Sequence, residues 1–149
     1  MDMMIKKSLL VMSAVGAFSL AAASDVSARS FGIGAGQANA PGDAVCFSRG
    51  SGTTTNTCAG GSRGFEVQLP TDNSGSKSVS FTGNNSVSCA AFATNSVNSA
   101  FVGSSTVVLP GSGFTTASLS AISLPAGGKL WLGCNVPQNA SLVTVNYNQ

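Results

Sequence analysis

Turn-forming residues divide this chain into short segments, and that division constrains its fold more than any other feature of the sequence. Clusters of glycine, proline, asparagine and serine recur about every 8–12 residues beyond residue 44. No stretch keeps an apolar i, i+3, i+4 pattern for three helical turns. The sequence therefore predicts an all-β fold, a single antiparallel β-sandwich or small barrel of about seven strands.

The segments between the turns alternate apolar and polar residues, as strands with one buried face do. In 65–69, Phe, Val and Leu alternate with Glu and Gln. Residues 79–82 and 87–91 flank an Asn-rich turn, which predicts a hairpin. In 129–134, two leucines and a cysteine face one way, while Lys129, Trp131 and a glycine face the other.

The first 28 residues have the pattern of a secretory signal peptide. Lys6 and Lys7 precede an uncharged apolar run from 8 to 23, and Val26-Ser27-Ala28 supplies small residues for cleavage, with 21–23 as a second candidate. A membrane anchor is the minor alternative, because the run is short for a span. No later run is apolar for long enough to cross a bilayer. We predict a secreted protein located outside the cell, on its surface or in the periplasm.

The mature chain divides into a Gly-rich N-terminal segment and one domain. Residues 29–44 contain Gly32, Gly34 and Gly36, and we predict that they form a flexible arm. Residues 45–149 carry the strand pattern and form the predicted sandwich domain.

All four cysteines lie after the cleavage site, where an even count in an oxidising compartment indicates disulfides. Of the three pairings, Cys46–Cys58 with Cys89–Cys134 is favoured, because the first closes a loop rich in Gly and Thr and the second joins two strand candidates. The cysteine spacings do not suit zinc, and we predict no metal and no cofactor.

The composition excludes several function classes. The chain has no histidine, the most common general base, and its net charge of +2 is not concentrated in a basic patch, so we expect no nucleic-acid partner. The mature chain has only three carboxylates, Asp43, Glu66 and Asp72, to act as a catalytic pair. We therefore predict no catalytic residue and no enzymatic activity.

Trp131 is the most suggestive side chain. If its strand belongs to a sheet with one open face, the ring could stack on a sugar, with Tyr147 as a second contact. If the strand is buried on both faces, Trp131 fills the core, and this interpretation is preferred because the sequence has a single Trp and a single Tyr. The phenylalanines of the mature chain are interpreted as core residues.

The arm suggests a way to assemble. Phe31, Ile33 and Ala35 alternate with small residues, so this segment could add a strand to a neighbour's sheet edge. The arrangement resembles that of chaperone–usher pilus subunits, whose arm completes the next subunit. It differs from them at Tyr147, which stands third from the end instead of penultimate. An arm that packs on its own sheet is the alternative.

These patterns favour a secreted, non-enzymatic structural or adhesive protein of the bacterial cell surface or extracellular matrix. Its partners would be further copies of itself or other surface proteins. A small extracellular carbohydrate-binding module, with a polysaccharide as its ligand, is the alternative. A secreted hydrolase or inhibitor is the further alternative.

Overall fold

The computed structural model describes residues 28–149, so the predicted signal peptide lies outside the described residues except for Ala28. The described chain is built of strands, with two short 3₁₀ helices, η1 (Ile33–Ala35) and η2 (Pro41–Cys46). None of the helices in this range is long and apolar enough to span a membrane. The strands are β1 (Ala28–Gly32), β2 (Gln37–Ala38), β3 (Phe47–Gly50), β4 (Thr53–Asn56), β5 (Arg63–Leu69), β6 (Gly75–Lys77), β7 (Val79–Gly83), β8 (Ser88–Thr94), β9 (Phe101–Gly103), β10 (Val107–Val108), β11 (Thr115–Ser118), β12 (Ile122–Leu124), β13 (Lys129–Val136) and β14 (Ser141–Asn148).

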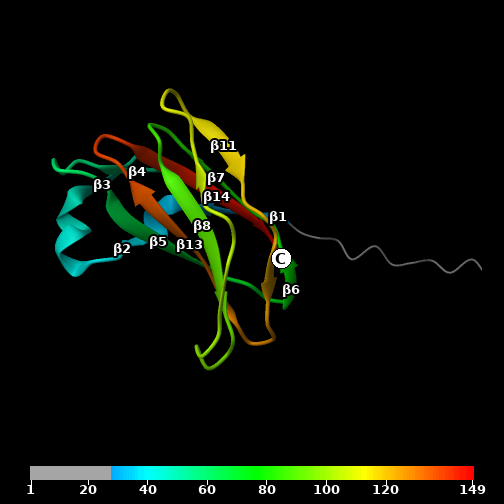
Figure 1. The fold of residues 1–149 in the computed structure, drawn as a ribbon. Coiled ribbons are helices and arrows are strands. Elements are labelled where there is room, and N and C mark those ends of the chain that lie inside the picture. The colour runs from blue at the N-terminus through cyan, green and yellow to red at the C-terminus, as the bar shows by residue number, and fades with distance from the viewer. Residues whose placement is uncertain (1–27) are drawn as a thin grey trace, which may run out of the picture.

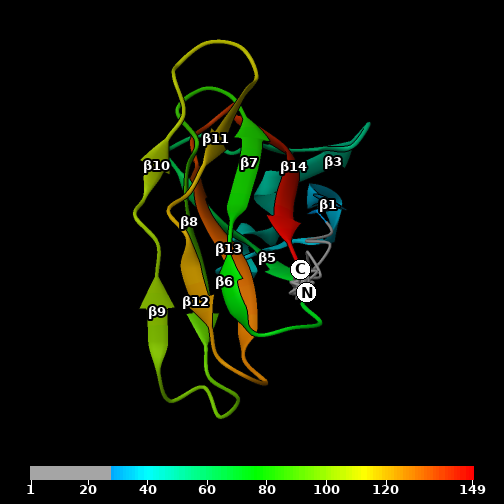
Figure 2. The ribbon, with the colours of Figure 1, turned by 90° about the vertical axis from the view of Figure 1, so that its right-hand side faces the viewer.

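Two antiparallel sheets of six strands pack as a sandwich, which confirms the predicted fold class (Figures 1 and 2). The first sheet has the order β11-β7-β14-β4-β3, and β1 also pairs with β14. The second has the order β10-β8-β13-β5-β2, and β9 also pairs with β8. A small third sheet joins β6 to β12 (Figure 2).

The core lies between the two large sheets and follows the period-two alternation of their strands. Phe65, Val67 and Leu69 of β5 are buried, as are Leu130 and Leu132 of the neighbouring strand β13. From the first sheet come further buried apolar residues, which include Val79, Phe81, Leu142, Val145 and Tyr147. Strand β13 is central because it pairs with β5 along one edge and with β8 along the other.

The two predicted disulfides are present with the predicted pairing. Cys89 of β8 lies directly opposite Cys134 of β13, and both side chains belong to the core. Cys46, at the end of η2, joins Cys58, which follows β4. Each bridge therefore crosslinks segments that already lie side by side.

The predicted hairpin of residues 79–91 is wrong, because β7 and β8 belong to different sheets. The reason is a non-local contact of the turn. The Asn84 amide N–H donates to the carbonyl oxygen of Ser141 at 3.1 Å, and the Asn84 side-chain oxygen accepts from the Ser141 N–H at 2.7 Å. The turn is thereby held against the start of β14, and the chain passes from one layer to the other.

Residues 29–44, predicted to form a flexible arm, pack on the chain's own sandwich in the structure. Strand β1 pairs with β14 from Ala28↔Asn148 to Gly32↔Thr144, which places the two ends of the described chain side by side. The Ile33 side chain is fully buried in the core. Gly36 lies so close to β5 that a Cβ atom there would stand 2.4 Å from Cε1 of Phe65. Only glycine allows this approach.

We predict that this segment contributes to global stability. Replacing Ile33 by Ala should lower the free energy of unfolding by about 2–5 kcal/mol, because it leaves a cavity in the core. The matched control is Val45→Ala, at a side chain that is 86% exposed, which should change it by less than about 0.5 kcal/mol. Urea unfolding of the disulfide-bonded protein measures both. Equal stability of the two variants would show that the segment does not pack as described.

Candidate functional site

The outer face of the second sheet carries the candidate site. Because β13 buries alternate residues, Lys129, Trp131 and Gly133 point away from the core, on the side opposite to the leucines. Trp131 is half-buried on this face. The register places Phe92 of β8 on one side of it and Gln68 of β5 on the other. The centre of this face is therefore aromatic, with a polar neighbour on β5.

Three rings form an aromatic cluster, which consists of Phe92, Phe101 and Trp131. Phe92 and Trp131 are stacked, with ring centroids 6.1 Å apart and an interplanar angle of 28°. Phe101 of β9 meets Trp131 edge-on, with centroids 5.0 Å apart. Such pairs add about 0.5–1.5 kcal/mol each beyond the area that they bury. The indole is thus held in one orientation before any ligand arrives.

Glycines on the neighbouring strands make room for this cluster. A Cβ atom on Gly133 would stand 2.9 Å from Cε2 of Phe92, and one on Gly103 would stand 3.4 Å from the other edge of the same ring. The Phe92 ring therefore lies over its neighbouring strands at positions that have no side chain. This allows it to lie beside the Trp131 ring.

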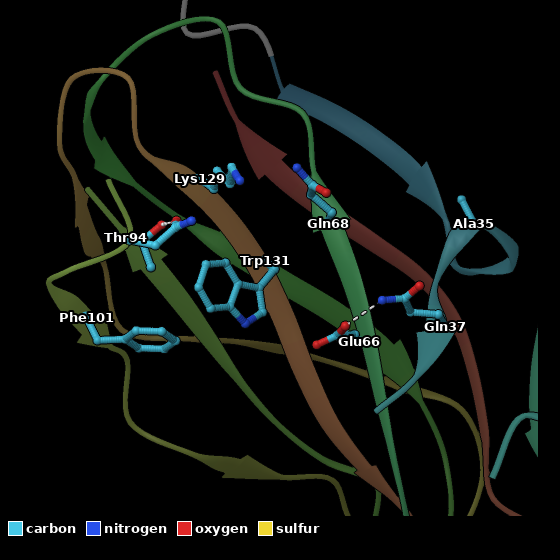
Figure 3. A pocket seen from close by; sticks show the side chains of 9 residues that line it. Ala35, Gln37, Glu66, Gln68, Thr94, Phe101, Lys129 and Trp131 are labelled. Carbon is cyan, nitrogen blue, oxygen red and sulfur yellow. Dashed lines mark hydrogen bonds between the residues drawn. The ribbon is translucent and has the colours of Figure 1, made fainter. Parts of the chain in front are cut away.

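A cleft of about 420 Å³, which we call the outer cleft, opens beside the aromatic cluster (Figure 3). This volume lies in the usual range of small-molecule sites, about 300–1,000 Å³. Trp131 stands in the middle, with Phe101 on one side and Glu66 and Gln37 on the other. Lys129 lies along the upper part of the view.

The polar side chains of the outer cleft are partly preorganised. Gln37 of β2 donates its side-chain N–H to Oε1 of Glu66 at 2.7 Å. Thr94 donates its hydroxyl to Oδ1 of Asn98 at 3.1 Å. One carboxylate, Glu66, and one ammonium group, Lys129, line the cleft, so their formal charges cancel.

The N-terminal segment forms one wall of the outer cleft. Ala35 and Gln37 line it from η1 and β2. Arg49 of β3 fixes this wall, because its guanidinium donates to the carbonyl oxygen of Gly34 at 3.0 Å and to that of Gly36 at 2.7 Å. The segment therefore belongs to the site as well as to the core.

The structure distributes the residues that the sequence singled out over different places. Trp131 lies on the open face of a sheet, not between two layers as the preferred interpretation held. Tyr147 instead lies in the core, 3% exposed, and its hydroxyl donates to the Pro70 carbonyl at 2.7 Å. Its ring has no surface to offer a ligand. Of the three arm residues, Ile33 is buried, Phe31 packs against the core, and Ala35 lines the outer cleft.

Sequence reasoning missed most of the residues around Trp131. Phe92 and Phe101 were expected in the core, but they join the aromatic cluster on the outer face. Phe92 carries a local signal, since its phase along β8 is opposite to that of Cys89 and Ala91. Phe101 carries none, because its place depends on the pairing of β9 with β8. Gln37 likewise depends on the pairing of β2 with β5.

The carboxylates of the described chain are dispersed. Asp43 lies 3.5 Å from Nε of Arg63, and Asp72 lies 2.6 Å from Nη2 of Arg29. Glu66 is the only carboxylate that lines the outer cleft. Within residues 28–149, no group of three or more His, Cys, Asp and Glu residues gathers in a way that could hold a metal ion.

Comparisons with known proteins identify the fold. No family model and no curated protein matches the chain. The C-terminal CBM6 of LamC, a marine laminarinase from Zobellia galactanivorans, has a TM-score of 0.52 and 8% identity, over 83% of this chain and 100% of that chain. The GH26-CBM35 β-(1,4)-mannanase of Podospora anserina has a TM-score of 0.53 and 13% identity, over 83% of this chain and 28% of that chain. At such identities the likeness shows a shared β-sandwich fold.

Proposed function

We propose that this chain is a carbohydrate-binding β-sandwich that takes a neutral polysaccharide segment into the outer cleft. The observation that carries the proposal is Trp131, held by Phe92 and Phe101 on an open sheet face and bordered by hydrogen-bonding side chains. The structural neighbours support this function over a purely structural one, because two of them are named for modules of the CBM6 and CBM35 types.

The chemistry of a sugar matches this surface. A pyranose ring has an apolar face of C–H groups and a rim of hydroxyls. The C–H groups pack on an aromatic face, which carries partial negative charge. Hydroxyls both donate and accept hydrogen bonds, so carboxylate, amide and ammonium groups can all bind them. Glu66, Gln68 and Lys129 supply these three groups around Trp131.

The charge of the outer cleft favours a neutral ligand. Its single negative group and its single positive group leave no net charge to attract or repel a polymer. A polyanionic glycan would require an excess of cationic groups, as other anion sites do. The proposed ligand is therefore a neutral glycan.

We also propose that the protein binds without hydrolysing its ligand. Glycosidases place two carboxyl groups about 5–10 Å apart across the scissile bond. Among the carboxylates of the described residues, only Glu66 lines the outer cleft. Asp43 and Asp72 each form an ion pair with an arginine elsewhere on the described surface. The outer cleft therefore lacks the second carboxyl group that hydrolysis of a bound glycan would require.

The proposed place of action is outside the cytoplasm. Two disulfides in a small domain are typical of oxidising compartments. In that setting glycan binding would give the protein an adhesive role at a polysaccharide surface.

We predict that Trp131→Ala abolishes most glycan binding without unfolding the protein. Loss of the stacking surface should weaken binding by about 1–3 kcal/mol, the range found when an aromatic side chain that stacks on a nucleic-acid base is removed. Affinity electrophoresis and calorimetry against a panel of neutral and acidic polysaccharides measure the effect. The control is Phe114→Ala, at a 56% exposed aromatic outside the outer cleft. Absence of binding across the panel, or equal binding by both variants, would contradict the proposed function.

We predict that the Glu66 carboxylate contributes through its charge. Glu66→Gln keeps the shape of the side chain but replaces a charge-assisted hydrogen bond by a neutral one, which should weaken binding about tenfold. Asp72→Asn is the matched control, because it removes a carboxylate that lies outside this cleft. Calorimetry with the best polysaccharide of the panel compares the two. An equal affinity of Glu66→Gln and the unchanged protein would remove Glu66 from the site.

A further inference from the structure

The outer cleft has two apolar surfaces that stand at nearly a right angle to each other. The plane of the Phe101 ring is inclined at 80° to that of Trp131, and the ring centroids lie 5.0 Å apart. Phe101, on the edge strand β9, is 64% exposed and lines the cleft. A pyranose that stacks on one ring presents its rim to the other. Stacking of a sugar on Trp131 therefore leaves a second apolar surface for a substituent on the rim of that sugar.

A row of side chains across the sheet brings Phe101 together with polar groups. Thr94 of β8 pairs with Phe101 on one side and with Lys129 of β13 on the other. All three side chains line the outer cleft. Figure 3 shows Thr94 and Phe101 on one side of Trp131 and Glu66 on the other. The two sides of the indole therefore differ, because one carries a carboxylate and the other an exposed apolar ring.

Asn98 adds a hydrogen-bond donor to the side of Phe101. Its side-chain oxygen accepts from the Thr94 hydroxyl at 3.1 Å, which fixes the orientation of the amide. No hydrogen bond joins the amide NH2 group to another residue of the range 28–149, and Asn98 lines the outer cleft. The cleft thus contains an oriented donor group that is available to a carbonyl oxygen of a ligand.

The loop that carries Asn98 is held in place by its own hydrogen bonds. The Asn95 side chain accepts from the Ser99 N–H at 2.8 Å and donates to the Ser99 hydroxyl at 2.8 Å. The Asn95 N–H donates to the carbonyl oxygen of Ala100 at 3.3 Å. Asn98 itself has a left-handed backbone, with φ of 56°. A donor that is fixed in this way costs little further ordering when a ligand binds.

We propose that the ligand of the outer cleft is a glycan of N-acetylated amino sugars, which places an acetamido group between Phe101 and Asn98. This inference rests on the proposed function and names the class of sugar. An acetamido group is uncharged and carries a methyl group beside a carbonyl oxygen. The methyl group packs on the exposed Phe101 ring, while the carbonyl oxygen accepts from the Asn98 side chain. Lys129, in the same row, is a second donor.

Other sugar substituents match this side of the cleft less well. A rim of hydroxyls alone would place polar groups against the Phe101 ring, which replaces none of the hydrogen bonds that they lose with water. A 6-deoxy sugar has a methyl group but no carbonyl oxygen for Asn98. A carboxylated sugar has no methyl group, and it brings a negative charge into a cleft that already holds Glu66. The acetamido group combines the apolar and the accepting parts without charge.

The test compares two ligands that differ only in this group. Chitohexaose carries acetamido groups at C2, where cellohexaose carries hydroxyls. Calorimetry with the mature, disulfide-bonded protein should give chitohexaose an affinity at least about tenfold higher, because one hydrogen bond and one buried methyl group are gained.

Variants at Asn98 show whether this residue carries the preference. Asn98→Gly permits the left-handed backbone and removes the amide, so the ratio of the two affinities should fall about three- to tenfold. Asn98→Asp replaces the donor by an acceptor and should lower the ratio at least as much. The matched control is Asn139→Gly, at another left-handed asparagine, with φ of 60°, that lies outside the cleft and should keep the ratio.

The possible outcomes separate this inference from the proposed function. Equal binding of the two hexamers, binding of neither, or tighter binding of any unacetylated polysaccharide of the panel overturns the acetamido assignment, while glycan binding as such stands if any member of the panel binds. A preference for chitohexaose that both Asn98 variants retain also overturns it. Absence of binding across the whole panel contradicts the proposed function itself. Because the ratio compares two ligands on one protein, a variant that is merely less stable does not change it.

Discussion

The alternation of β13 is the constraint on which both the fold and the candidate site depend. Its inner face contributes Leu130, Leu132 and one half of the Cys89–Cys134 bridge to the core, while its outer face presents Trp131 to the cleft. Strands β5 and β8 pair with it on both edges, so the backbone that carries the indole is fixed by two ladders and a covalent bond. A shift of the register by one residue would exchange the two faces, burying Trp131 and exposing the leucines. The stability of the core therefore also specifies the geometry of the site.

A second link connects the site to the other sheet. The N-terminal segment leaves β1 in the first sheet, buries Ile33 in the core and reaches β5 of the second sheet as β2. Arg49, from β3 of the first sheet, holds the carbonyl oxygens of Gly34 and Gly36 on the way. Gln37, which orients Glu66, thus depends on contacts made by both layers. This segment supplies a wall of the outer cleft because it is part of the packed domain.

Features that depend on local patterns could be predicted from this sequence. Features that depend on contacts between distant strands could not. The alternation in 65–69 and 129–134 predicted the buried residues of β5 and β13, and the spacing of the cysteines favoured the pairing that is found. Whether Trp131 faces a second layer or an open surface depends on what covers the outer face of its sheet, and no residue near Trp131 encodes that. The prediction of a hairpin at 79–91 was wrong because Asn84 forms hydrogen bonds with Ser141, which lies far along the chain. The burial of Tyr147 could not be predicted either, because its hydroxyl donates a hydrogen bond to the carbonyl oxygen of Pro70, which is also distant in sequence.

The scarcity of charge relates the outer cleft to the edge beside it. A surface solvated by hydroxyl and amide groups offers hydrogen bonds to a glycan without setting up a field that would favour ions over sugars. The same composition leaves β9 without the lysines that usually keep sheet edges apart. Phe101 stands at the junction, because it packs on Trp131 through its ring while its backbone forms the edge. A charge placed on this strand to protect the edge would lie next to the aromatic cluster and would raise the polarity of the site. The neutrality that suits the proposed ligand therefore extends from the outer cleft to the edge of its sheet.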